Sequence, residues 1–420
     1  MICVKTPESS HDFASDPLDL YVDEKGWLRA RGTTLGADNG AGVAHMLAIL
    51  DDQSLKHPPL ECFFSVQEEQ GLGGARQMDY ALFQSKRIIS TDILVEGVNF
   101  LSTANAIGGD FIKQVIFENS PGKAIKLKVH QCSGGHAALN ISKDPANAIK
   151  CLARLLFSIN ETCPINLSAL TGGSARNNVP TEAAAVFTYE EGDGAKIQTI
   201  VDELAEVIKR EYSFTDPKLT VDLIDGPAPG RALTRESSDS VLAFLYILPN
   251  GVHYRDHKYG LDQSFVPTSA GPMSHDVFAS TNTGLAALDG DRLVIGKMFR
   301  GAAATIVLDL KKQVETMAAA YDAHYVEEYR YPGFIVPQGS RLTALYEEIY
   351  QEFTGRKVVN INLHGGNEGG TMVNNLGGPG VVDIVSIGVD ATDIHTFNEA
   401  MDLESFDRVY QYLITLLERL

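Results

Sequence analysis

The sequence predicts an α/β protein whose mostly parallel sheet is interrupted by an α+β insertion. Strand-like, turn and helical segments alternate through residue 92, a rhythm typical of parallel sheets with helical connections. From residue 110 to 312 apolar residues instead alternate along strands, and buried-type strands and helices return over 313–420. With 420 residues the chain also exceeds what one hydrophobic core usually holds. We therefore expect a first domain formed by residues 1–109 and 313–420, and an inserted lid domain.

Each expected element rests on a local pattern. Small and aliphatic residues at helical spacing after Asp38 or Asn39, either of which is a good N-cap, predict the first helix. In the first part we expect a hairpin over 21–30, helices over 40–50 and 75–83, and strands over 60–66 and 87–92. In the insertion we expect strands over 125–130 and 183–189, and helices over 146–158 and 196–211. In the last part we expect helices over 340–353 and 403–420, and strands over 358–363 and 381–387.

Composition excludes several classes of function. The net charge of −19 leaves no basic patch for nucleic acid, and the scattered lysines and arginines do not favour a membrane surface. No apolar run reaches the roughly 18 residues of a transmembrane helix. Five cysteines without C-x-x-C spacing indicate reduced thiols and a cytoplasmic location.

Four carboxylates stand where predicted strands end or helices begin. Asp38, the pair Glu68 and Glu69, and Asp92 belong to neighbouring segments of one sheet. Taken singly, each fits a helix cap, a solvated helix start or a strand end. Taken together they are electrostatically costly unless a cation lies between them. The sequence therefore predicts a divalent metal site, in which one glutamate binds metal and the other accepts a proton from water.

Three of the eleven histidines occupy loops that suit a functional role. His395 follows a buried strand through a polar loop, His136 lies on a glycine turn of the insertion, and His364 precedes two glycines. Taken alone, each also fits an ordinary structural position. The glycine-rich residues 71–74 match neither a P-loop nor a dinucleotide fingerprint, and no G-x-S-x-G elbow offers a serine nucleophile.

Motifs spread along the chain resemble the co-catalytic zinc dipeptidase family, and within it the aminoacyl-histidine (Xaa-His, or cytosol non-specific) dipeptidase branch. They are Gly-Thr-Thr-Leu-Gly-Ala-Asp-Asn-Gly (32–40), Glu-Glu-Gln-Gly-Leu-Gly-Gly-Ala (68–75), Ser-Thr-Asp (90–92), Gly-Gly-His (134–136), Gly-Gly-Ser-Ala-Arg-Asn-Asn-Val-Pro (172–180), His-Gly-Gly-Asn-Glu (364–368) and Ile-His (394–395). They occur in the family's order, with an insertion of the expected size.

The resemblance implies a role for each matching residue. Asp38 would bridge two zinc ions, Glu68 would be the general base, and Glu69, Asp92 and His395 would complete the metal ligands. His136 would stabilise the oxyanion from the lid. Arg300 would hold a substrate carboxylate, and Asn178 and His364 would line the same cleft. Manganese and cobalt remain alternatives to zinc.

One motif of the family is missing. Its members carry a strand with His-x-Asp, whose histidine binds one zinc, directly before a Met and an apolar residue. This sequence starts with Met1 and Ile2. We therefore expect that roughly 70 to 80 residues of a family member are absent, and that a metal ligand and the cover of a sheet edge are absent with them.

The resemblance implies a metal-dependent hydrolase that cleaves dipeptides, of the Xaa-His type or with broad specificity. Two rivals within the superfamily stay open, a tripeptidase and an N-acyl-amino-acid hydrolase. A third alternative, favoured by the missing motif, is an inactive relative that binds peptides. The expected partners are a short peptide substrate and, as an open alternative, a second copy in a homodimer.

Overall fold

The computed structural model describes residues 3–120, 122–226, 228–255 and 277–420, so Met1 and Ile2 lie outside the described residues. The chain divides into two compact units. Unit 1 comprises the described residues up to Ala104 and from Pro332 onward, and unit 2 those from Asn105 to Tyr331. Among the described residues, no helix is both long and apolar enough to cross a membrane.

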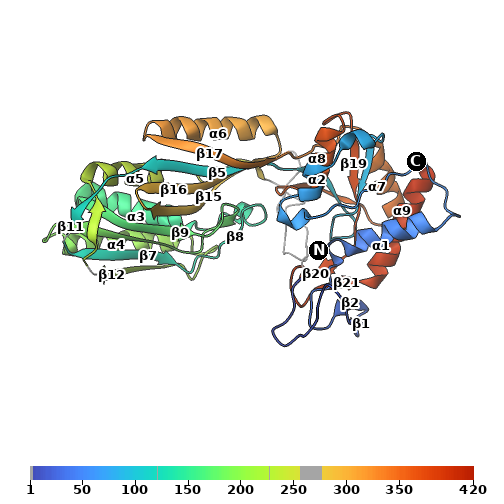
Figure 1. The fold of residues 1–420 in the computed structure, drawn as a ribbon, viewed down its shortest axis with the longest axis horizontal. Coiled ribbons are helices and arrows are strands. Elements are labelled where there is room, and N and C mark those ends of the chain that lie inside the picture. Colours follow the sequence, from blue (N-terminus) through green and yellow to red (C-terminus); the bar gives the residue numbers. More distant parts are fainter. Residues whose placement is uncertain (1–2, 121, 227, 256–276) are drawn as a thin grey trace. The chain divides into compact units, whose positions relative to one another are not determined.

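Unit 1 carries helices and short sheets that together build the site described below (Figure 1). Its helices are α1 (Ala37–Asp51), α2 (Gly73–Gln77), α7 (Arg341–Thr354), α8 (Glu368–Asn375) and α9 (Leu403–Arg419), with 3₁₀ turns η1 (Glu68–Gln70) and η2 (Tyr80–Leu82). Its strands are β1 (Leu20–Val22), β2 (Trp27–Ala30), β3 (Arg87–Ser90), β4 (Val98–Thr103), β18 (Val359–Leu363), β19 (Asp383–Ser386), β20 (Ala391–Thr392) and β21 (Ala400–Asp402).

The central strands of unit 1 pair in parallel, as the sequence predicts for this part. β19 pairs with β3, and β18 pairs with β4. The Ser386 backbone N–H of β19 donates to the Asn99 side chain of β4 at 2.9 Å, which joins the two pairs. Residues of α1, α7 and α9 contribute to a core cluster with β19, and in Figure 1 α1 and α9 lie beside one another.

Two features of unit 1 differ from the expected parallel sheet. β1, β2, β21 and β20 form a separate antiparallel sheet, in which the short connections β1–β2 and β20–β21 allow only antiparallel pairing. Residues 60–66, expected as a strand, have no strand assignment. A strand needs a neighbouring backbone about 4.8 Å away, and within the described ranges no strand pairs with this segment.

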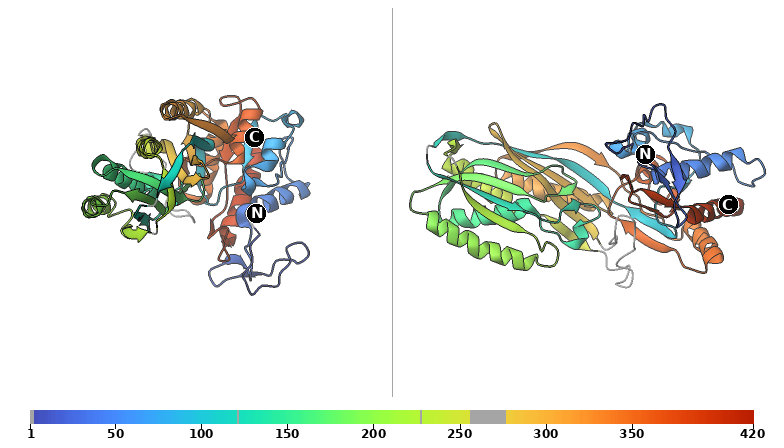
Figure 2. Two further views of the ribbon diagram at one scale, coloured as in Figure 1. Left: turned by 60° about the vertical axis from the view of Figure 1, so that its left-hand side comes forward. Right: turned by 90° about the horizontal axis from the view of Figure 1, so that it is seen from below.

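Unit 2 is built around one large sheet (Figure 2). Its helices are α3 (Ala148–Thr162), α4 (Gly194–Glu211), α5 (Arg235–Ile247) and α6 (Ala304–Ala319), with the 3₁₀ turn η3 (Ile141–Lys143). Its strands are β5 (Asn105–Gln114), β6 (Phe117–Ser120), β7 (Ala124–His130), β8 (Gly135–His136), β9 (Ile165–Gly173), β10 (Asn178–Val179), β11 (Ala183–Tyr189), β12 (Thr220–Gly226), β13 (Gly230–Leu233), β14 (Gly251–Arg255), β15 (Val277–Asp289), β16 (Arg292–Gly301) and β17 (Ala323–Tyr331).

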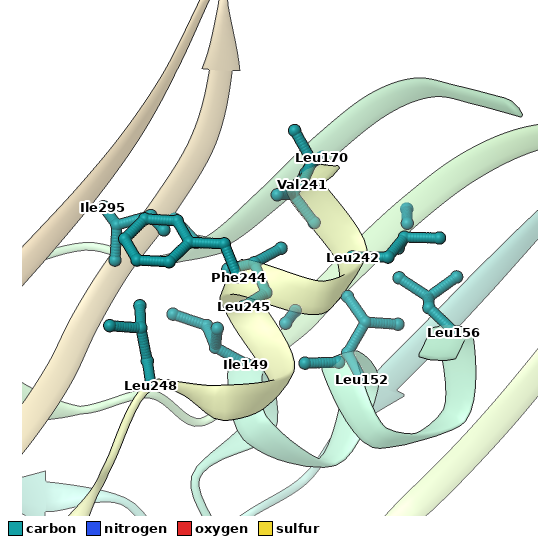
Figure 3. Packing of buried hydrophobic residues seen from close by; sticks show 14 of the residues in the cluster. Ile149, Leu152, Leu156, Leu170, Val241, Leu242, Phe244, Leu245, Leu248 and Ile295 are labelled. Atoms are coloured by element: carbon teal, nitrogen blue, oxygen red, sulfur yellow. The ribbon is translucent and has the colours of Figure 1, made fainter. Parts of the chain in front are cut away.

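The large sheet is antiparallel throughout, so "mostly parallel" is wrong for the chain as a whole. Its order is β12-β7-β11-β9-β15-β16-β5-β17, with β14 added on β15. Alternating apolar residues on these strands pack against α3 to α6 in a single core. Figure 3 shows part of this core, where Leu152 of α3 packs near Leu242 and Leu245 of α5.

Unit 2 is wider than the insertion expected over 110–312. β5 starts at Asn105, and β17, which follows residue 312, pairs with β5 along its length. The pairing places Tyr331 opposite Ala106, so the first and last strands of unit 2 are neighbours.

Candidate metal centre and active site

Asp38 is held at the start of α1 by the local packing. Asp38 and Asn39 have non-helical backbone angles at a kink inside α1, and the Gly42 N–H donates to the Asn39 side chain at 3.1 Å, so Asn39 caps the regular part of the helix that follows the kink. A Cβ on Gly42 would lie 2.3 Å from the Thr91 Oγ1. Glycine at this position lets the first turn of α1 approach the end of β3, next to Asp92.

Glu68 and Glu69 lie in a tight turn that faces the same region. Gln67 precedes them with a left-handed backbone, φ 57°, and the Leu72 N–H donates to the Glu68 carbonyl at 2.8 Å. A Cβ on Gly74 would lie 2.6 Å from the Val66 nitrogen, so glycine is required for this turn to close. The two neighbouring glutamates are thereby fixed in position.

His395 joins two of the carboxylates. Its Nε2 lies 2.8 Å from the Glu69 Oε1 and 3.2 Å from the Asp38 Oδ2. One ligand atom from each of Asp38, Glu69 and His395 lies within 4.8 Å of the others. His395 also has a left-handed backbone, φ 65°, and residues in that strained region are concentrated at functional sites. The structure thus brings together three residues predicted as metal ligands.

A buried glutamate that sequence reasoning did not select supports two of the ligand loops. Glu399 is 3% exposed, and its carboxylate accepts the backbone N–H groups of Leu35 at 3.0 Å, Gly36 at 2.9 Å and Asp38 at 3.4 Å. Its own N–H donates to the Thr396 carbonyl at 3.2 Å. Glu399 therefore ties the Asp38 loop to the His395 loop. In the sequence, only its position four residues after His395 could have indicated that Glu399 supports the site.

The carboxylates of this cluster repel one another. Burial, followed by the charges of Glu69, Asp38 and Glu368, raises the pKa of Glu68 to about 7. Burial, followed by the charges of Asp38, Glu68, Glu368 and Glu69, raises the pKa of Asp92 to about 8. The pKa values of both carboxyl groups are thus above their ordinary values, as expected for carboxylates that gather around a position where positive charge would be favourable.

The donor set fits divalent metal ions. Carboxylate oxygens and an imidazole nitrogen are the ligands that zinc takes in proteins. Asp92 is outside the three-residue group, but it lies close enough to Asp38 for the charge of that residue to raise the Asp92 pKa. A cation bound among these groups would remove the repulsion that raises the pKa of Glu68 and Asp92.

Of the motif 364–368, the sequence predicted His364 as a site residue, but in the structure it is Glu368 that lies near the carboxylate cluster. His364 is 4% exposed, and it is not one of the three residues whose ligand atoms gather in the group of Asp38, Glu69 and His395. Glu368, at the first residue of α8, accepts the Ser65 Oγ–H at 2.7 Å, and its charge contributes to the raised pKa values of Glu68 and Asp92. Glu368 stands in the motif of residues 364–368, but nothing in that motif distinguishes it from an ordinary helix-start glutamate.

In unit 2, His136 has the properties of a neutral hydrogen-bond donor. Its Nδ1 accepts the Ala138 N–H at 3.2 Å, so in the neutral ring the proton is on Nε2. Burial and then the charge of Arg300 lower its pKa to about 4. At neutral pH the imidazole is therefore uncharged and can donate from Nε2.

Arg300 and Asn178 lie near His136 in the same unit. Asn178 is opposite His136 in the β8–β10 pair, and its carbonyl accepts from the Asn282 amide at 2.7 Å. Arg300, 4% exposed on β16, donates to the Tyr331 hydroxyl, while its Nε has no hydrogen-bond partner among the described residues. A buried guanidinium with an unused donor suits an anionic ligand.

Comparisons with known proteins identify the family. The model of "Peptidase family M20/M25/M40" matches residues 3–419. The chain belongs to this peptidase family. The motifs that resemble those of the co-catalytic zinc dipeptidases all lie within the residues that match this family.

Two similar proteins match nearly the entire chain. The "Cytosol non-specific dipeptidase" of Escherichia coli (strain K12) is 29% identical over 426 residues, which span 100% of this chain and 83% of that protein. The crystal structure of the aminoacylhistidine dipeptidase from Vibrio alginolyticus matches with a TM-score of 0.87 and 24% identity, over 99% of this chain and 82% of that chain, and this shows the fold.

Proposed function

We propose that this protein is a metal-dependent dipeptidase, in which Glu68 acts as the general base beside a metal site formed by Asp38, Glu69, Asp92 and His395. The observation that supports this most directly is the group formed by Asp38, Glu69 and His395, with Glu68 next to it at a raised pKa, in a chain of a peptidase family. The similar E. coli protein, a cytosol non-specific dipeptidase, supports a dipeptide substrate and a cytosolic location.

In this proposal Asp38, Glu69, Asp92 and His395 would hold the metal, most simply zinc. When bound, such ions polarise a carbonyl group and lower the pKa of water. Glu399 holds the Asp38 loop in place through three backbone N–H groups, which is the kind of support from outside the ligand set that tunes metal sites.

Glu68 transfers the proton. Its carboxylate takes a proton from the attacking water and returns it to the amine that leaves when the peptide bond breaks. A pKa of about 7 suits both steps at neutral pH, because a group with such a pKa gains and loses a proton with similar ease.

The residues of unit 2 keep the roles that the family resemblance implies, as predictions. His136, neutral and protonated on Nε2, donates to the oxyanion of the tetrahedral intermediate. Arg300 binds the carboxylate of the substrate, and Asn178 lines the same cleft. The unused Arg300 Nε and the low His136 pKa support these assignments.

The test is a hydrolysis assay with matched substrates. The purified chain, treated with chelator and then supplied with zinc, manganese or cobalt, is given a dipeptide, Gly-Gly-Gly and an N-acyl amino acid. We expect metal-dependent release of amino acids from the dipeptide. Faster cleavage of Gly-Gly-Gly or of the N-acyl substrate would instead identify a tripeptidase or an acyl-amino-acid hydrolase.

Glu68→Gln is the informative variant. It should bind metal like the unmodified chain but hydrolyse about 10²- to 10⁴-fold more slowly, the usual contribution of a general base. Binding of a dipeptide without turnover by the unmodified, metal-loaded chain, measured by calorimetry, would overturn the proposal in favour of a peptide-binding protein.

A further inference from the structure

A buried aspartate of unit 2 takes no part in the mechanism proposed above. Asp216 is 2% exposed and lies in the turn that follows α4. Its Oδ1 accepts the backbone N–H of Ser133 at 2.6 Å, and its Oδ2 accepts the backbone N–H of Ala146 at 2.8 Å. A buried charge is costly unless hydrogen bonds compensate it, and bonds to an ionised group are stronger than neutral ones. Both carboxylate oxygens of Asp216 thus hold the backbone at these two residues.

Ser133 and Ala146 are the two ends of the loop that carries His136. This loop follows β7 and precedes α3, and it contains the short strand β8 and the 3₁₀ turn η3. We call residues 133–146 the His136 loop. A flexible loop has many arrangements of its ends, and fixing both ends on one carboxylate removes that freedom.

Asp216 is itself fixed in its turn by backbone hydrogen bonds. Its N–H donates to the Tyr212 carbonyl at 2.8 Å, and its carbonyl accepts the Leu219 N–H at 3.0 Å. Leu219 is 4% exposed and belongs to the core of unit 2. The Ser133 hydroxyl donates to the Thr215 carbonyl at 2.7 Å, which adds a second link between the turn and the loop. The His136 loop is therefore attached to backbone that the core holds in place.

The backbone around His136 is tightly packed inside the loop. The His136 carbonyl accepts the Asn140 N–H at 2.8 Å, and a Cβ on Gly135 would lie 2.5 Å from the Asn140 Oδ1. The Ala137 N–H donates to the Asn177 carbonyl at 2.7 Å, beside the β8–β10 pair. This part of the loop has little room to adjust by itself, so a shift at either end of the loop also shifts the imidazole.

We propose that Asp216 is a positioning residue for His136, which it holds in place by fixing both ends of the His136 loop. The inference rests on the proposed function, in which the His136 Nε2–H donates to the oxyanion of the tetrahedral intermediate. Such a donor must lie about 2.7 to 3.1 Å from the position of the developing charge. A displacement of about 1 Å can lower a rate about 10²-fold. Asp216 acts only through the backbone, and the bond changes take place elsewhere.

Asp216→Asn tests the proposal with almost no change in side-chain shape. The amide keeps one acceptor oxygen but turns an NH₂ group toward the other backbone N–H, so one end of the His136 loop is released. With a dipeptide and the metal-loaded chain, we expect kcat to fall about 10- to 100-fold. KM should change by less than about 3-fold, because an oxyanion donor acts in the transition state and not on the bound substrate.

A double-variant cycle assigns this loss to His136. In a His136→Ala chain, Asp216→Asn should lower kcat by less than about 2-fold, because the group that it positions is already absent. An unchanged kcat in the single variant, or the same fall with and without His136, would overturn the proposal.

Asn160→Ala is the matched control for a general loss of stability. The Asn160 Oδ1 accepts the Ile165 N–H at 3.1 Å and so supports a different connection of unit 2, between α3 and β9. This variant should unfold at lower urea concentration while kcat and KM stay unchanged. A fall in kcat equal to that of Asp216→Asn would mean that any weakening of unit 2 lowers the rate, and the proposal would fail.

Ser133→Ala is a milder second variant in case Asp216→Asn does not fold. Ser133 is exposed, and the substitution removes only its hydroxyl bond to Thr215. We expect the same pattern in weaker form, with kcat about 3-fold lower and KM unchanged. If Asp216→Asn does not fold and Ser133→Ala has the kcat of the unmodified chain, the turn does not position His136.

Amide hydrogen exchange reads the loop without substrate. In Asp216→Asn, residues 134–140 should exchange at least about 10-fold faster, whereas β11 should keep its rate. Unchanged exchange over 134–140, or an equal loss of protection in β11, would overturn the proposal. If the unmodified chain hydrolyses no dipeptide, the proposed function fails, while the exchange measurement still decides whether Asp216 fixes the His136 loop.

Discussion

Replacing Glu68 by glutamine should stabilise the metal-free protein at alkaline pH. Burial and the surrounding carboxylates raise the Glu68 pKa from 4.5 to about 7 in the folded chain. The folded state therefore binds this proton more tightly than the unfolded chain does. The stability that the proton contributes is complete below pH 4.5 and is lost as pH rises through 7. Glutamine resembles the protonated form at every pH.

The pKa difference gives the magnitude. One pKa unit corresponds to about 1.4 kcal/mol. The free energy of unfolding of Glu68→Gln should therefore exceed that of the unmodified chain by about 3 kcal/mol at pH 8.5, and by less than about 1 kcal/mol at pH 5. The assay is urea unfolding in the presence of chelator, followed at pH 5, 6, 7 and 8.5, with the transition of unit 1 analysed separately from that of unit 2.

A second glutamate serves as a control of opposite sign. The backbone N–H groups of Ser85 and then Gln84 lower the pKa of Glu61, so Glu61→Gln should lower stability at neutral pH. If Glu68→Gln is no more stable than the unmodified chain at pH 8.5, or if its gain in stability is the same at all pH values, then burial and the neighbouring carboxylates do not raise the pKa of Glu68.

Four further predictions follow from the same structure. Chelation should lower the thermal midpoint of unit 1 and added zinc should restore it, because an ion that binds only the folded state stabilises it; an unchanged midpoint in a scanning calorimeter would contradict a metal site. Glu399→Gln should weaken zinc affinity about 10- to 100-fold by calorimetry while the fold is retained, and unchanged affinity would mean that Glu399 does not position Asp38. His136→Ala should lower kcat about 10²- to 10³-fold with little change in KM, whereas an effect on KM alone would assign His136 to binding. Arg300→Gln, which removes the positive charge, should raise KM for a dipeptide at least about 30-fold but not for the dipeptide amide, as expected on losing a buried charge pair, and equal effects on the two substrates would exclude a carboxylate contact.

The sequence predicted what depends on local pattern. Alternation gave the antiparallel strands β7 and β11, and helical periodicity gave α3, α4, α7 and α9, with ends displaced by a few residues. The clustering of Asp38, Glu69 and His395 was expected from their polar, glycine-rich loops, but the structure achieves it without a parallel strand directly before any of the three.

The rest depends on tertiary contacts that the sequence does not display. Residues 60–66 have the composition of a strand, but a strand forms only against a partner backbone. Glu399 is an ordinary-looking glutamate whose importance comes from three N–H groups more than 350 residues earlier in the chain. Asn39, and not Asp38, caps the regular part of α1 after the kink, since the Gly42 N–H donates to the Asn39 side chain.

The parallel pairs of unit 1 impose an order on folding during synthesis. β3 ends at Ser90, but its partner β19 begins only at Asp383, roughly 300 residues later. At about 5 to 20 residues per second, the ribosome takes roughly 15 to 60 s to cover that distance. All strands of the large sheet lie between Asn105 and Tyr331, so unit 2 is complete in sequence before either parallel pair can form. A released fragment that ends at residue 340 should therefore already contain a protease-resistant unit 2, while its residues up to Ala104 stay protease-sensitive.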